Sequence, residues 1–271
     1  MKKAILFLFF IERMIMKNFA ISLCFLLMTL VSFTASAQYQ RGDVDHNGSV
    51  NIADVTSLVD YILYGTWDSD PGAPSDGYEY VDLGLPSGTL WATMNVGAAR
   101  PEDVGSFFAW GETEPKDCYD WSPYKWCDGS YNTLTKYCSQ DGYGNIDNIL
   151  ELVPGDDAAY VNWGPCWRIP PQNQADELIR KCSWQWTTLN GVDGYMVTGP
   201  NGNSIFLPYS GTFNGSDFYD NAGNYWTRTR GLTNRNHGAY KLQFTRWQVY
   251  ISSDNSCYGL CVRAVYVWPN F

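Results

Sequence analysis

Short runs of β-branched and aromatic residues, bounded by turn residues, fill the chain from residue 77 to the C-terminus. Such runs predict short strands. They cover residues 88–96, 195–198, 204–207, 238–245 and 260–267. The strongest signal is a hairpin across residues 195–207, because Asn201-Gly202 between two such runs favours a tight turn with positive φ angles. We therefore predict a largely antiparallel sheet structure.

Helical spacing is rare by comparison. Residues 172–182 follow Pro170-Pro171 and place Ala175, Leu178, Ile179 and Cys182 on one side of a predicted helix. A second run, residues 55–64, has apolar residues at 55, 58, 59, 62 and 63 and ends at Gly65. Together the patterns predict an α+β fold, mostly antiparallel with few helices, for residues 77–271.

Residues 43–54 match a calcium-binding loop at the positions where the chemistry restricts the choice. Oxygen-bearing side chains stand at loop positions 1, 3, 5, 9 and 12, Gly48 occupies the sharp turn, and Val50 points inward. The candidate ligands of a Ca²⁺ ion are Asp43, Asp45, Asn47, Ser49, Asn51 and Asp54. The alternative is an Asp/Asn/Gly turn that binds no metal.

A helix normally precedes such a loop, yet Gly42 directly abuts Asp43. A loop followed by one helix resembles the repeat of a dockerin module, here across residues 38–65. Dockerins carry two repeats, whereas residues 66–76 contain no second one and are typical of a Pro/Gly/Asp-rich linker. A helix of about ten residues is unstable alone. Its apolar face is therefore expected to dock on the downstream domain, a second copy of the chain or a cohesin-like receptor.

The N-terminus is typical of a secretory signal peptide, assigned to residues 1–37 with a possible start at Met16. Lys17 provides the basic start, residues 19–31 the apolar stretch, and Ala35-Ser36-Ala37 the cleavage site. The apolar stretch is shorter than a membrane-spanning helix requires. We expect a secreted or cell-surface protein with no membrane insertion after signal cleavage.

Charge and side-chain chemistry exclude several functions. Removing residues 1–37 takes away four basic residues and one acidic residue, leaving 14 basic against 27 acidic residues and a net charge of −13. Binding to nucleic acid is therefore not expected. Only His46 and His237 are present, too few for a histidine-rich zinc cluster. Seven cysteines follow residue 37, and their odd number leaves at least one unpaired within the chain; the sequence does not determine the pairing.

Ordered blocks in the C-terminal region resemble the family known as the Fibrobacter succinogenes major paralogous domain. The blocks are residues 81–97, 101–105, 108–113, 162–164, 167–170, 198–208 and 259–263. The resemblance spans nearly all of residues 77–271. That family is similar to the C-type-lectin-like and formylglycine-generating-enzyme fold, so the resemblance implies this fold. It implies no activity.

Departures from that fold family bear on the expected chemistry. Pro171 stands where a helix-capping Thr is usual, so the predicted helix loses its side-chain cap. Cys257 and Cys261 lie near the place of a catalytic cysteine pair, but their spacing and flanking residues do not match. The calcium signatures through which many C-type lectins hold sugars are absent, so a calcium-bridged sugar site is not expected in this domain. Because catalytic motifs are also absent, we expect binding rather than catalysis.

Aromatic residues make up 16% of the chain. Trp91, Trp110, Trp163, Trp167 and Trp226 lie within the shared blocks or the Gly223-Asn224-Tyr225-Trp226 segment and are predicted to be core. Others lie in polar segments, where a flat ring can stack on a sugar. The candidate ligand-binding residues are Trp121, Trp126, Arg228, Arg230, Arg235, Trp247 and Tyr250.

Three functional hypotheses follow. The first is a secreted, calcium-binding, non-catalytic binding or adhesion protein whose ligand is a glycan or a surface protein. The second is a dockerin-anchored component of polysaccharide degradation, either a hydrolase or an accessory protein. The third is a variable protein diversified by a retroelement, since lectin-like domains of this kind serve as such targets.

Overall fold

The computed structural model describes residues 77–231 and 237–267. All described residues belong to one compact unit, Gly72–Asn270. The predicted signal peptide, calcium loop with its helix, and linker lie outside the described residues. No helix within 77–231 or 237–267 is long and apolar enough to cross a membrane.

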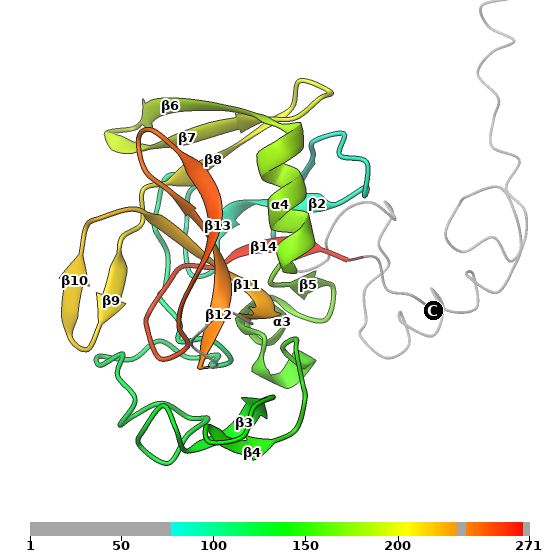
Figure 1. Cartoon of the computed structure of the whole chain (residues 1–271). Coiled ribbons are helices and arrows are strands. Elements are labelled where there is room, and N and C mark those ends of the chain that lie inside the picture. Colours follow the sequence, from blue (N-terminus) through cyan, green and yellow to red (C-terminus); the bar gives the residue numbers. More distant parts are fainter. Residues whose placement is uncertain (1–76, 232–236, 268–271) are drawn as a thin grey trace, which may run out of the picture. The chain divides into compact units, whose positions relative to one another are not determined.

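The two ends of the described domain meet in one sheet (Figure 1). Its strands are β1 (Tyr80–Asp82), β2 (Leu90–Asn95), β14 (Arg263–Tyr266) and β5 (Trp167–Arg168), in the order β1-β2-β14-β5. All three pairings are antiparallel. The β2 strand lies between strands from opposite ends of the sequence.

The predicted hairpin is present in a second sheet, β6-β7-β8, formed by Ser183–Leu189, Val192–Thr198 and Ser204–Pro208. Its turn differs from the prediction. The Gly202 N–H donates to the Gly199 carbonyl at 3.0 Å, so Pro200 and Asn201 are the central residues. Gly202 has φ 89°, whereas Asn201 is not among the residues with positive φ. Pro200 explains the change, because its ring fixes a negative φ at the first central position.

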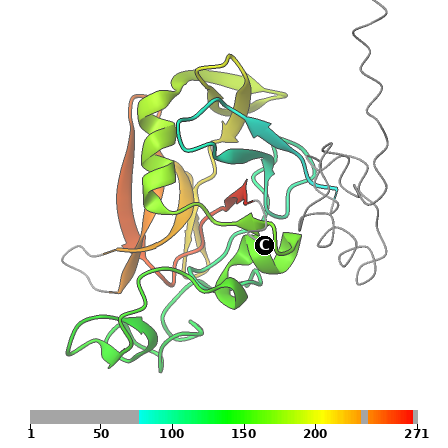
Figure 2. The ribbon, with the colours of Figure 1, turned by 90° about the vertical axis from the view of Figure 1, so that its right-hand side faces the viewer.

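The third sheet has the order β11-β12-β13, formed by Gly223–Arg230, Gly238–Phe244 and Val249–Asn255. Helix α4 (Gln172–Lys181) packs against this sheet (Figures 1 and 2). The helix presents the predicted residues Ala175 and Leu178 to the core. The observed elements confirm a mostly antiparallel fold with few helices.

Shorter elements complete the domain. The pair β9 (Thr212–Asn214) and β10 (Asp217–Tyr219) is antiparallel, whereas β3 (Leu134–Cys138) and β4 (Gly144–Ile146) are parallel. A 3-10 turn, η1 (Pro154–Asp156), leads into α3 (Ala158–Trp163). In both views the β3–β4 pair lies at the end of the domain opposite β6–β8 (Figures 1 and 2).

The predicted core tryptophans are confirmed. Each is at most 4% exposed, and they are Trp91, Trp110, Trp163, Trp167 and Trp226. Two of them donate their indole N–H to a backbone carbonyl. Trp110 donates to Thr227 and Trp226 to Phe108, both at 2.8 Å. Satisfying their N–H groups lets Trp110 and Trp226 be buried without unpaired donors, whereas the indole nitrogen of Trp91 is buried without a hydrogen-bond partner among the described residues.

The start of α4 shows how a missing cap is replaced. Pro171 occupies the cap position and makes no side-chain cap bond, as predicted. The N–H of Gln172 instead donates to Thr229 Oγ1 at 3.0 Å. A hydroxyl from β11 thus satisfies an N–H that the local sequence leaves open.

Arg263 joins strands of two sheets from a fully buried position. Its guanidinium donates to Asn95 Oδ1 at 2.8 Å and to the carbonyls of Ala92, Thr93 and Phe206 at 3.1, 3.3 and 2.9 Å. Burial lowers the pKa of Arg263 to about 10. The group therefore stays charged at neutral pH and bonds β14 to both β2 and β8.

Asp157 also links separate segments of the chain by buried hydrogen bonds, here near α3. Its Oδ1 accepts from the N–H groups of Ala159 and Tyr160 at 2.9 and 3.2 Å and caps the helix. Ile169 N–H donates to Oδ1 and Oδ2 of the same carboxylate at 3.1 and 3.0 Å. One side chain therefore fixes α3 to the segment between β5 and α4.

Candidate binding face

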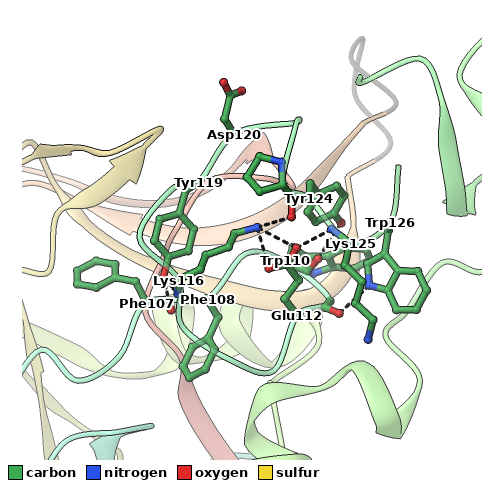
Figure 3. A network of polar contacts seen from close by, with 12 residues as sticks. Phe107, Phe108, Trp110, Glu112, Lys116, Tyr119, Asp120, Tyr124, Lys125 and Trp126 are labelled. Carbon is green, nitrogen blue, oxygen red and sulfur yellow. Dashed lines mark hydrogen bonds and ion pairs between the residues drawn. The ribbon is translucent and has the colours of Figure 1, made fainter. Parts of the chain in front are cut away.

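The irregular segment between β2 and β3 is held in place by a buried carboxylate (Figure 3). Glu112 pairs with Lys116, whose Nζ lies 2.8 Å from Oε2 and 2.9 Å from Oε1. The N–H of Lys125 donates to Oε1 of Glu112 at 2.7 Å. These bonds draw residues 112, 116 and 125 together, although no helix or strand spans them.

Two buried tyrosines fasten the same segment to the core. Tyr119 donates to the Phe107 carbonyl at 2.7 Å, and Tyr124 donates to the Trp110 carbonyl at 2.8 Å (Figure 3). Burial raises the pKa of both phenols, so each remains a protonated donor. The segment that carries Trp121 is therefore positioned by buried hydrogen bonds.

Three aromatic rings, one of them Trp121, surround a histidine. The His237 ring centroid lies 5.4 Å from Trp121, 5.0 Å from Tyr131 and 5.9 Å from Tyr143. We call these four residues the aromatic face. Tyr131 is 47% exposed, while Trp121, Tyr143 and His237 are half-buried. The face combines flat apolar rings with two tyrosine hydroxyls and an imidazole.

The aromatic face joins distant parts of the sequence. Trp121, Tyr131 and Tyr143 come from the segment around β3 and β4, whereas His237 directly precedes β12. The Ser256 N–H donates to the His237 carbonyl at 3.1 Å, which anchors the histidine to the end of β13. The candidate residues proposed from the sequence come from both regions and include Trp121. No binding role was assigned from the sequence to Tyr143 or His237.

Exposed carboxylates accompany the rings along the chain. Asp120 precedes Trp121, Asp128 lies in the turn that carries Tyr131, and Asp141 lies two residues before Tyr143. Asp120 points away from the Glu112 network in Figure 3. Carboxylate oxygens beside an apolar ring provide hydrogen-bond acceptors for a ligand with hydroxyl groups.

Trp126 is already engaged by the protein. Its indole N–H donates to the Gly111 carbonyl at 2.7 Å, and the ammonium groups of Lys125 and Lys136 lie 4.4 and 4.6 Å from its ring centroid. Both lysines also pair with Asp156, at 3.6 and 2.6 Å. Trp126 therefore takes part in an internal cation–π arrangement.

The predicted arginines are distributed differently. Arg230 is 1% exposed and donates to Ser139 Oγ, so its guanidinium faces the interior. Arg228 is half-buried and pairs with Glu151 at 2.8 Å. Arg235 lies outside the described residues. Arg228 and Arg230 both have partners within the domain.

Trp247 and Tyr250 lie far from the aromatic face. Trp247 is 86% exposed in the turn between β12 and β13, and Tyr250 is half-buried at the start of β13. His237 stands at the other end of β12, and a strand of this length separates the two ends by about 20 Å. The structure thus brings Trp121 to the aromatic face but not Trp247 or Tyr250.

Burial lowers the reactivity of several cysteine thiols. All seven described cysteines are free thiols, and Cys127, Cys138 and Cys257 lie in one apolar cluster. Burial raises the pKa of Cys182 to about 11 and that of Cys261 to about 12, and it also raises the pKa of Cys257. Such thiols stay protonated at neutral pH and are poor nucleophiles. Within residues 77–231 and 237–267, no three His, Cys, Asp or Glu side chains gather as a metal site.

Comparison with known proteins returns no match, whether the chain is compared with protein-family models, with curated proteins or with solved structures.

Proposed function

We propose that this protein is a secreted, calcium-binding, non-catalytic binding or adhesion protein that contacts a glycan or a surface protein through the aromatic face. The observation that carries the proposal is the arrangement of Trp121, Tyr131 and Tyr143 around His237. The C-type-lectin-like fold implied by the family resemblance is part of this proposal. So are export to the cell surface or medium and the calcium loop.

The physical support comes from preorganisation. The segment carrying Trp121 is fixed by Glu112 and by the two buried tyrosine hydroxyls. Little conformational entropy is then lost when a ligand settles on the rings. Rings of this kind match the C–H face of a pyranose, and the tyrosine hydroxyls, with carboxylates near the rings in sequence, offer hydrogen bonds to its polar edge.

Alanine substitutions on the aromatic face test the proposal. A glycan-array screen of residues 38–271, with calcium and then with chelator, identifies a ligand. Trp121→Ala and Tyr131→Ala are each expected to weaken binding at least about tenfold, because a central aromatic contact contributes at least about 1.4 kcal/mol. Dissociation constants from calorimetry check this. Loss of binding in the control Trp247→Ala, with none in Trp121→Ala, would move the site to the β12–β13 turn.

Calcium removal tests the proposed metal loop. At ~100-fold excess over its dissociation constant, bound calcium stabilises the folded loop by ~2.7 kcal/mol. Asp43→Ala is expected to remove most of that gain, because it deletes the first ligand position. Calorimetric titration of residues 38–271 with Ca²⁺ measures the change. Asp60→Ala, a carboxylate after the loop, should bind as the unaltered chain does, and equal calcium binding by the Asp43 variant would overturn the assignment.

A role in polysaccharide degradation remains as the second proposal, supported by the single dockerin-like repeat. In that case residues 55–64 dock on a cohesin-like receptor. Capture of such a receptor by the chain, lost when residues 38–65 are deleted, would favour this role. A neighbouring reverse-transcriptase gene with a template repeat would instead favour the third hypothesis, a retroelement-diversified protein.

A further inference from the structure

Lys241 is buried in the centre of the β11-β12-β13 sheet, on the middle strand. It is 4% exposed, an unusual environment for a lysine. Its Nζ donates to Asn224 Oδ1 at 2.8 Å and to Asp254 Oδ2 at 2.9 Å. One acceptor belongs to β11 and the other to β13. An amine, a carboxamide and a carboxylate therefore meet across three neighbouring strands.

The carboxamide of Asn224 is held in one orientation. The residue is 0% exposed, and its Nδ2 donates to Thr212 Oγ1 at 2.8 Å and to the carbonyls of Gly211 and Ala222 at 3.3 and 3.2 Å. Three acceptors around Nδ2 assign the other amide atom, Oδ1, to the side of Lys241. Since a C=O bond is about 1.2 Å long and Nζ is 2.8 Å from Oδ1, the amide carbon lies within about 4 Å of the lysine nitrogen.

We propose that Lys241 and Asn224 form an intramolecular isopeptide bond, with Asp254 as the proton-transfer group. Asp254 accepts a proton from the Lys241 ammonium. The freed amine lone pair attacks Cγ of Asn224, giving a tetrahedral carbon. The new Nζ–Cγ bond is kept, the Cγ–Nδ2 bond breaks, and the departing nitrogen takes up the proton lost by Nζ.

The reaction balances without an oxidant, a reductant or a cofactor. An amine and a primary amide become a secondary amide and ammonia, and Asp254 returns its proton so that an ammonium ion leaves. Two features of the site favour the step. The reacting groups are held at contact distance by strand pairing, which replaces a bimolecular encounter. Burial also limits the access of water, which would otherwise compete with the lysine for the amide carbon.

A buried lysine with polar partners can also be a purely non-covalent feature of the sheet. The two cases differ in covalent mass. Intact-mass measurement and peptide mapping are therefore made on the purified, folded chain. The unaltered chain is expected to lack the mass of one ammonia. It should give a branched tryptic peptide that joins Lys241 to Asn224, with no cleavage after Lys241.

Variants identify the participants. Lys241→Arg keeps the positive charge but lacks the primary amine, so it is expected to have the full mass and no branched peptide. Asp254→Asn is expected to slow formation of the link at least about a hundredfold, the lower end of the range for loss of a proton-transfer group. Lys136→Arg is the matched control, because Lys136 also contacts a carboxylate, that of Asp156 at 2.6 Å. This control should remain fully linked.

Several results would overturn the proposal. An ordinary tryptic peptide ending at Lys241 in the unaltered chain, at full mass, shows that the contact is non-covalent. Loss of ammonia confined to a linear peptide containing Asn224 shows cyclisation of that residue onto its own backbone instead. Linkage at an equal rate in Asp254→Asn would remove Asp254 from the proton path. Because the first two outcomes are read from the unaltered chain, poor folding of a variant leaves them decisive.

Discussion

Arg263→Ala is expected to lower the free energy of unfolding by about 4 kcal/mol, because it leaves several buried acceptors without donors at about 1 to 3 kcal/mol each. The acceptors are Asn95 Oδ1 and the carbonyls of Ala92, Thr93 and Phe206. Arg263→Lys is expected to recover only a small part of the loss. A single ammonium group cannot reproduce the fork of a guanidinium.

Urea denaturation followed by tryptophan fluorescence measures this effect. Arg180→Met is the matched control, since Arg180 is largely exposed and its pair with Asp176 is an i,i+4 contact on α4. An exposed pair of this kind contributes roughly 0.3 to 0.5 kcal/mol. A loss below about 1 kcal/mol in Arg263→Ala would show that water or a rearrangement replaces the missing donors.

Asp157→Ala is expected to destabilise the domain by about 3 kcal/mol at neutral pH. The substitution removes the N-cap of α3, which contributes about 1 kcal/mol, and leaves the Ile169 N–H unpaired in the interior. Asp157→Ser separates the two effects. Serine caps helices well but has one oxygen, so it should recover the capping part and not the link to Ile169.

The same carboxylate gives a defined dependence on pH. Burial raises the pKa of Asp157 from its ordinary value of 3.8 to about 6, although three N–H donors oppose the shift. The folded state therefore binds more protons than the unfolded state between these values. The additional stability that the protonated carboxyl provides is present at low pH and is lost as pH rises from about 4 to about 6.

Comparing the unaltered chain with Asp157→Ala across pH 4 to 7 isolates this contribution. Other carboxylates have the opposite shift: hydrogen bonds from Asn190 and Arg100 lower the pKa of Glu102 and Asp103 respectively. Their effect is common to both proteins and cancels in the difference. If the difference in unfolding free energy stays constant over this range, the carboxyl group titrates at the same pH in both states.

The predictable part of the fold came from local signals. Runs of β-branched residues located β2, β7, β8, β12 and β14, and the spacing of Ala175 and Leu178 located α4. The β13 strand was not predicted. It begins Val-Tyr-Ile but continues Ser-Ser-Asp-Asn, a sequence that suits a turn. It is a strand because it pairs with β12 along its whole length, and tertiary pairing of this kind overrides local preference.

In the candidate site, too, local sequence signals predicted some residues, and long-range packing determined the others. Trp121 could be proposed from composition alone, because it lies in a polar, aromatic-rich segment. The place of His237 beside it depends on packing between residues more than 100 positions apart, which no local pattern records. Arg230 was proposed for ligand binding because it lies among the polar and aromatic residues of the C-terminal part of the chain. Its burial depends on the position of β11 between β12 and residues 150–152, and on the bond from its guanidinium to Ser139, which are again long-range properties.

The central place of β2 also determines how the domain would respond to mechanical force. β1 and β14 run in the same direction on either side of β2, since both pair with it antiparallel. Tyr80 pairs opposite Ala92, whereas Tyr266 pairs opposite Leu90. Tension applied at the start of β1 and the end of β14 therefore pulls along the strands, in shear. In shear the hydrogen bonds resist together, whereas in peeling they break one after another, so an adhesion protein stretched between its ends would hold longer before it unfolds.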